Sequence, residues 1–307
     1  MTKSDPRWAY VLTNVSAFLW GTNFVLGRLL RADIGPSTLT LARFIVAGLV
    51  FILLLRRVPI EERRPGAQWP WLVGMGLTGV VGFTVLLYSG LKSTTATNAG
   101  LINGAGPLII SLMAALFLRE TLTPAMLLGA VISLGGVAYI ASGGSLPNLF
   151  SLQFNVGDLL VLGAVISWGF YSVLGRVVTR TRSSLSASAL SSLFGLPFLV
   201  PLALMEQTTQ PVNATPLVLA ACVYIGLFPS VVAYLAWNEG IRRVGAARGT
   251  IFYNMLTVFA ALLGTLVLGE PFTQTQIIGG LLVIGGSFIS LGPELWKSFR
   301  SPVTIRG

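Results

Sequence analysis

The sequence predicts an all-α integral membrane protein of ten transmembrane helices, arranged as two inverted five-helix repeats. Of its 307 residues, 54% are hydrophobic and only 10% are charged, whereas soluble domains carry about 25% charged residues. Apolar runs of about twenty residues recur along the chain, which is the length that a helix needs to cross roughly 30 Å of hydrocarbon. Short blocks of the first half also recur, in the same order, in the second half.

Turn signals such as Gly35-Pro36 and Glu270-Pro271 separate the apolar runs from one another. The runs are too long for an outer-membrane β-barrel, and they lack its two-residue alternation. The predicted spans cover residues 9–30, 37–55, 70–91, 96–118, 123–142, 157–178, 184–205, 216–239, 246–268 and 273–292.

The basic residues predict the orientation of these spans. With the N-terminus inside, sixteen of the twenty Lys and Arg residues fall in inner segments, and only Arg28, Arg31 and Lys92 fall in outer loops. Because cytoplasmic loops of membrane proteins are rich in Lys and Arg, we expect both termini in the cytoplasm, in a bacterial inner membrane. This bias accounts for the net charge of +10 without nucleic acid. We expect a monomer whose partners are the lipid bilayer and a small-molecule substrate.

The internal repeat is the feature that bears most on function. Trp20-Gly21 recurs as Trp168-Gly169 at an offset of 148, and Glu120 is matched by Glu270 at an offset of 150. We therefore expect a first repeat at 1–142, a linker at 143–156, a second repeat at 157–292 and a cytoplasmic tail at 293–307. Five is an odd number, so the second repeat enters the membrane from the opposite side. Inverted repeats are typical of secondary transporters, whose site lies near midplane between the halves.

These features resemble the drug/metabolite transporter superfamily, and more closely its EamA-type branch. The resemblance rests on the paired Trp-Gly motifs, on the stretch 98–136 with its Leu118-Arg119-Glu120-Thr121 ending, and on Gly269-Glu270-Pro271. It covers nearly the whole chain, and its motifs indicate the family more than the substrate. It implies export of small metabolites, notably aromatic amino acids. A nucleoside, a sugar phosphate and a drug-like molecule are the alternatives.

Composition argues against an enzyme. The chain has no histidine and one cysteine, so His-ligated metals, Ser-His catalysis and Cys-His catalysis are excluded. We expect no cofactor, no metal and no catalytic residue. A membrane-embedded enzyme would need catalytic groups at one depth, and a channel would need a ring of like groups. None of the ten acidic residues falls at midplane, which favours a facilitator or weakly coupled exporter over a proton antiporter.

The candidate binding residues are aromatic and amide side chains predicted to lie inside the spans. Trp20 and Trp168 lie at mid-span. Each is followed three residues later by a polar residue on the same helix face, which is Asn23 in the first case and Tyr171 in the second. Amides facing lipid are costly, so those in the spans should face protein or water. Helix packing is the alternative explanation for the tryptophans. The predicted substrate-binding residues are Trp20, Asn23, Asn98, Asn103, Pro107, Trp168, Tyr171, Tyr234, Tyr253 and Asn254.

Other polar residues are predicted at or near the span ends. Trp237 and Asn238 are placed near the inner mouth, where a gate role and a substrate contact are both open. Glu120 and Glu270 are expected to cap or pair at helix ends. We expect Arg43, about six residues into its span, to snorkel outward or to form a structural pair, with binding of a substrate carboxylate as the alternative.

Overall fold

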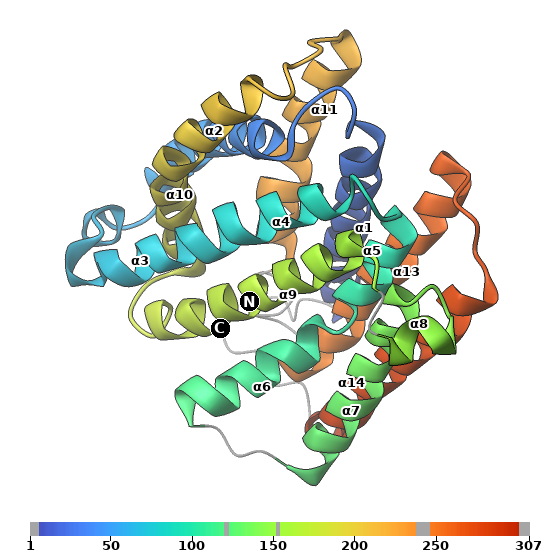
Figure 1. The fold of residues 1–307 in the computed structure, drawn as a ribbon. Coiled ribbons are helices and arrows are strands. Elements are labelled where there is room, and N and C mark those ends of the chain that lie inside the picture. The colour runs from blue at the N-terminus through green and yellow to red at the C-terminus, as the bar shows by residue number, and fades with distance from the viewer. Residues whose placement is uncertain (1–5, 120–122, 152–153, 238–245, 301–307) are drawn as a thin grey trace.

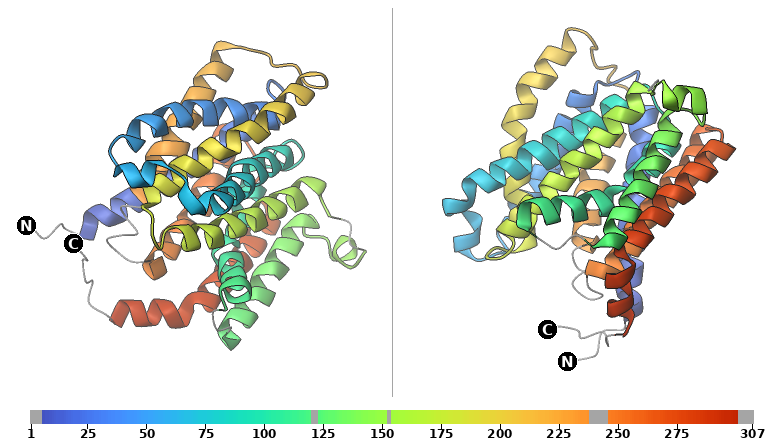
Figure 2. Two further views of the ribbon diagram at one scale, coloured as in Figure 1. Left: turned by 90° about the vertical axis from the view of Figure 1, so that its left-hand side faces the viewer. Right: turned by 60° about the horizontal axis from the view of Figure 1, so that its bottom comes forward.

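The computed structural model describes residues 6–119, 123–151, 154–237 and 246–300. Within these ranges the chain is helical and contains no strand. Seven segments are long and apolar enough to cross a membrane. Figure 1 shows these helices gathered into one bundle, and Figure 2 shows the start of α1 and the end of α14 at the same end of it.

The first half comprises the helices up to residue 141. They are α1 (Pro6–Leu29), α2 (Pro36–Leu55), the short turns η1 (Ile60–Arg63) and η2 (Gly66–Gln68), α3 (Trp69–Met75), the π-helical η3 (Gly76–Gly82), α4 (Phe83–Gly90), α5 (Ala96–Asn103), α6 (Gly106–Leu118) and α7 (Pro124–Ala141). The segments α3, η3 and α4 follow one another without a gap and form one span.

The second half follows the short helix α8 (Leu146–Phe150). It consists of α9 (Val156–Val178), α10 (Ser184–Gln207), α11 (Pro216–Leu227), the π-helical η4 (Phe228–Val232), α13 (Ala246–Leu268) and α14 (Gln274–Arg300). Helical residues 233–237 continue η4. The observed segments agree with the ten predicted runs to within a few residues at most ends.

The fourth predicted span is broken, which the apolar run did not indicate. α5 ends at Asn103 and α6 begins at Gly106. Pro107 has no N–H with which to bond the Asn103 carbonyl, and glycine is a poor helix former. The first part of this span, α5, packs on α13, whereas the second part, α6, packs mainly on α9. The two parts of this span therefore pack on different neighbouring helices.

Glycines allow close helix approach at corresponding places in the two halves. A Cβ at Gly76 would lie 2.7 Å from the carbonyl oxygen of Ser191, and one at Gly226 would lie 2.8 Å from that of Arg43. The helices α7 and α14 pack in the same manner, since a Cβ at Gly136 would lie 2.8 Å from the Gly279 carbonyl oxygen. A larger residue would push these helices apart.

Acidic side chains tie helix ends together across the two halves. Glu206, near the end of α10, accepts hydrogen bonds from the backbone N–H groups of Ser37 (3.1 Å) and Thr38 (2.8 Å) at the start of α2. At the other end of α10, Glu62 accepts from the backbone N–H of Ser183 at 2.9 Å, just before that helix begins. Carboxylates at helix N-termini satisfy free N–H groups and complement the helix dipole.

Candidate functional site

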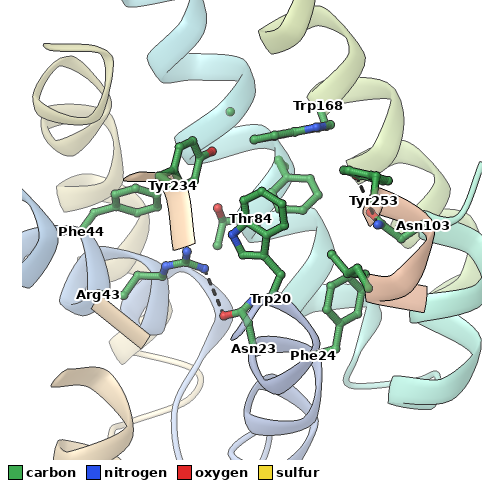
Figure 3. Close-up of a pocket in the computed structure, with 13 residues that line it drawn as sticks. Trp20, Asn23, Phe24, Arg43, Phe44, Thr84, Asn103, Trp168, Tyr234 and Tyr253 are labelled. Atoms are coloured by element: carbon green, nitrogen blue, oxygen red, sulfur yellow. Dashed lines mark hydrogen bonds between the residues drawn. The ribbon is translucent and has the colours of Figure 1, made fainter. Parts of the chain in front are cut away.

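A cavity of about 50 Å³ lies among helices of both halves of the chain, smaller than the 300–1,000 Å³ typical of small-molecule sites. Figure 3 shows its side chains converging from several helices. The lining residues are Trp20, Asn23, Phe24, Arg43, Phe44, Gly79, Phe83, Thr84, Asn103, Trp168, Tyr234, Tyr253 and Leu256.

The aromatic wall of the cavity is continuous from one half to the other. Trp20 donates its indole N–H to the carbonyl of Pro229 at 3.1 Å, which fixes the ring. Tyr234 lies between the two tryptophans, with ring centroids 5.9 Å from Trp20 and 6.1 Å from Trp168. Trp168 in turn stacks on Tyr171 at 4.7 Å. Edge and stacked contacts at these distances are favourable arrangements of aromatic rings.

The cation Arg43 lies on another side of the cavity. Its Nη1 donates to Asn23 Oδ1 (3.2 Å) and to the Tyr88 hydroxyl (2.9 Å). Its Nε and Nη2 donate to Ser230 Oγ at 3.0 and 2.8 Å. Arg43 is 5% exposed, so the expectation that it snorkels to the outer interface is wrong. The side chain points inward, and it lines the cavity.

Asn103 and Tyr253 meet at another point of the wall. The Asn103 amide donates to the Tyr253 hydroxyl at 3.2 Å, and both residues are buried. They are separated by 150 residues, the offset that relates the two halves of the sequence. The break between α5 and α6 begins directly after Asn103, so this pair marks the point where the two helices part.

Six of the ten predicted binding residues line the cavity. They are Trp20, Asn23, Asn103, Trp168, Tyr234 and Tyr253. Tyr171 lies beside it, in an adjoining hollow of about 10 Å³ that also includes serines of α10.

The remaining predicted residues lie elsewhere. Asn98 is in the first turn of α5, where it accepts a hydrogen bond from Gln276 at 3.0 Å and donates to Asp158 at 3.4 Å. Pro107 and Asn254 are buried but do not line the cavity. Trp237 packs against Trp20, with ring centroids 5.3 Å apart. Asn238 and Glu120 lie outside the described residues.

Glu270 holds the start of α5. Its carboxylate accepts from the backbone N–H groups of Ala96 and Thr97, both at 2.8 Å, and from the Thr97 hydroxyl at 2.8 Å. Arg28 approaches the same carboxylate at 3.9 Å. Among the described residues, no group of three His, Cys, Asp or Glu side chains is placed to hold a metal ion.

Seven lining residues were not among the predicted binding residues. Six of them belong to apolar runs in which no pattern separates a cavity wall from a lipid-facing side: Phe24, Phe44, Gly79, Phe83, Thr84 and Leu256. The seventh is Arg43, which the sequence could have identified as a site residue. A charge inside a membrane span usually faces the protein interior and marks a functional site.

A model of the EamA-like transporter family matches residues 7–142 and 155–292. The chain belongs to the EamA-like transporter family. The two matched ranges together cover most of the sequence, and each of them includes one of the Trp-Gly motifs.

Three EamA-like relatives align over nearly their whole length. The uncharacterized transporter YyaM of Bacillus subtilis is 28% identical, over 92% of this chain and 93% of the relative. A probable terminal-alkyne amino-acid exporter of Streptantibioticus cattleyicolor is 30% identical, over 93% of each chain. The aromatic amino acid exporter YddG of Ancylobacter novellus is 28% identical, over 92% of this chain and 97% of the relative. Family membership and these names agree that the chain is a multi-pass membrane transporter.

Proposed function

We propose that this protein exports small metabolites across the bacterial cytoplasmic membrane, with aromatic and hydrophobic amino acids as its main substrates. It does so by alternating access between two inverted five-helix repeats. The observation that carries the proposal is the cavity, because its wall contains Trp20 from the first half and Trp168 from the second half. A site built from both halves is the arrangement that alternating access requires.

Two observations support the inverted repeats. The family model matches the chain twice, in two ranges of similar length. The close approach of Gly76 to the Ser191 carbonyl also corresponds to that of Gly226 to the Arg43 carbonyl, at offsets of 150 and 148 residues. Two halves related by a pseudo-two-fold axis produce such reciprocal contacts.

The arrangement of the bundle supports an inward-facing or occluded state. The outer end is tied by Glu206 on α2 and by Glu270 on α5. At the inner end, Glu62 ties the start of α10, whereas α6 leaves α13 and packs on α9. In this proposal, breaking the outer contacts while α6 approaches α13 opens the cavity to the outside.

The lining supports an amphipathic substrate. Aromatic rings offer an apolar surface, while Asn23, Asn103 and Arg43 offer hydrogen bonds to a polar group. A zwitterion with an apolar side chain needs both kinds of surface. Two relatives carry amino-acid exporter names, which agrees with this choice. The positive-inside bias supports cytoplasmic termini, and we propose that a monomer without a cofactor carries out transport.

The test is uptake of labelled amino acids by purified protein in liposomes, with and without a pH gradient. We expect saturable movement of phenylalanine or another hydrophobic amino acid, with little dependence on the gradient because no acidic residue was found at midplane. Empty liposomes are the control. If no amino acid or related metabolite moves, the proposed substrate class is wrong. A strict requirement for the gradient would contradict weak coupling.

A further inference from the structure

We infer that Arg43 binds a carboxylate of the transported molecule, and that the cavity therefore selects small carboxylic acids over neutral or purely cationic analogues. This inference rests on the proposed function, since it assigns one chemical group of the substrate to one residue of the same cavity. Arg43 lies seven residues after the start of α2, roughly 10 Å below the outer end of that helix at 1.5 Å per residue. This depth is well inside the bundle.

The charge of Arg43 has no acidic partner. All its hydrogen bonds go to neutral groups of Ser230, Asn23 and Tyr88. No Asp or Glu among the described residues lies within ion-pair distance of it, and the ion pair found there joins Arg28 and Glu270. A buried charge is costly unless it is paired. An incoming carboxylate would supply the missing countercharge.

The neutral partners hold the guanidinium in one orientation. Ser230 Oγ donates its own hydrogen to the Ile225 carbonyl at 2.8 Å, so its oxygen is set to accept from Arg43. The Arg43 Cζ lies 4.9 Å from the ring centroid of Phe44 and 5.9 Å from that of Tyr88. Of the two Nη2 hydrogens, one has no acceptor among the described residues. A planar guanidinium held in this manner can donate that hydrogen to a carboxylate in a charge-assisted hydrogen bond.

The position of Arg43 also defines the rest of the ligand. Figure 3 shows Arg43 beside Asn23, with Trp168 and Tyr253 across the cavity from it. A molecule with its carboxylate at Arg43 would extend its side chain toward these rings. The cavity thus has one cationic end and one aromatic end, which matches a small acid with an aromatic or bulky apolar group.

The first experiment compares three ligands of nearly the same shape on the purified wild-type protein: L-phenylalanine, L-phenylalaninamide and 3-phenylpropanoate. Binding is measured by tryptophan fluorescence and by thermal shift. We expect the amide to bind about 10- to 100-fold more weakly than phenylalanine, because it brings no negative charge to pair with the guanidinium. The phenylpropanoate should retain measurable binding. Equal affinity for phenylalanine and its amide would overturn the inference.

The second experiment uses variants and reads the ratio of the two affinities, which a general loss of folded protein does not change. Arg43→Met should bind phenylalanine and its amide alike. Arg43→Lys keeps the charge but loses the planar fork, and it should retain part of the preference. Arg57→Gln, an exposed arginine just beyond α2, should keep the wild-type ratio. If Arg43→Met keeps the wild-type ratio of the two affinities, the inference is overturned. If this variant does not fold, the comparison of the three ligands on the wild-type protein decides alone.

Failure of the inference can be separated from failure of the proposed function. Liposomes that transport phenylalanine and phenylalaninamide equally well would contradict carboxylate binding but leave metabolite transport standing. If the wild-type protein moves no amino acid, the proposed substrate class fails. The role of Arg43 is then decided by whether the protein binds 3-phenylpropanoate more tightly than 3-phenylpropanamide. If no carboxylate probe binds, the inference about Arg43 is overturned.

Discussion

The fourth and ninth spans are related by an offset of 150 residues in the sequence, yet one is broken and the other is continuous. α5 stops at Asn103 and α6 starts at Gly106, whereas α13 runs from Ala246 to Leu268. At an offset of 150 residues, the Gly104, Gly106 and Pro107 of the break correspond to Asn254, Leu256 and Thr257. The first set interrupts a helix and the second set does not, so the difference originates in the local sequence.

The difference between these spans explains where the cavity lies. α5 stays packed on α13 while α6 leans on α9, so the helices fork at Asn103, whose amide bonds to Tyr253 on α13. A continuous fourth span could not contact both neighbours in this manner. The comparison teaches that α5 holds the fourth span to the bundle, while α6 makes room for the cavity.

The largest expected effect comes from Gly100→Ala in α5. A Cβ at this position would lie 2.4 Å from the Ala260 Cβ of α13. Overpacking of such a contact costs typically about 1–3 kcal/mol, so the melting temperature of the purified protein should fall. Gly135→Ala is the matched control, because nothing lies within 4 Å of its added Cβ. Its stability should be unchanged or slightly higher, and equal melting of the two variants would contradict close packing of α5 on α13.

Glu270→Gln is expected to loosen the outer contact of α5. The amide keeps one acceptor oxygen but loses the charge that strengthens hydrogen bonds to Ala96 and Thr97. A loss of about 1–2 kcal/mol corresponds to a roughly 5- to 30-fold change in a conformational population. The measurement is labelling from outside of a cysteine introduced by Thr84→Cys, in a Cys222→Ser background.

Labelling should be faster with Glu270→Gln than without it. Glu61→Gln serves as the control, because Glu61 is exposed in the short helical turn η1. Identical labelling rates in the two variants would show that Glu270 does not hold the outer end closed.

The smallest effect is expected from Pro107→Ala. Alanine restores an N–H that can bond the Asn103 carbonyl, so α6 should align better with α5 and leave less room beside α13. We expect an initial transport rate about two- to fivefold lower, as is common when a substitution hinders a conformational step. Pro124→Ala, at the first turn of α7 where proline is tolerated, should transport normally. A faster rate in Pro107→Ala would contradict the role given to the fork.

Most of the fold could be predicted from the sequence, because hydrophobic runs and turn residues report directly on helix length. The break after Asn103 was not predicted from the apolar run. An apolar run of 23 residues suffices to span the membrane whether or not its helix is continuous. Hydrophobicity therefore predicts that a segment crosses the membrane, but it does not predict whether the helix axis changes direction within that segment.

The candidate site could be predicted in part. Trp20, Trp168 and Asn103 are polar or amphipathic groups in apolar surroundings, so they stood out. Phe83 and Leu256 did not, because apolar side chains toward lipid, toward another helix and toward a cavity look alike in one sequence. Arg43 was expected to snorkel outward because it lies near a span end. Its side chain instead points inward to Ser230, and the sequence does not show this contact because the two residues are far apart in the chain.

Uptake of labelled phenylalanine by liposomes containing Trp20→Ala or Trp168→Ala tests most directly whether this cavity is the transport site. We expect each variant to fold and to transport at least about tenfold more slowly, because each loses an aromatic contact of the kind that dominates binding sites. Trp71→Ala, an exposed tryptophan of α3, should transport like the wild type. Wild-type rates in both cavity variants would contradict the central claim and leave Trp20 and Trp168 as packing residues.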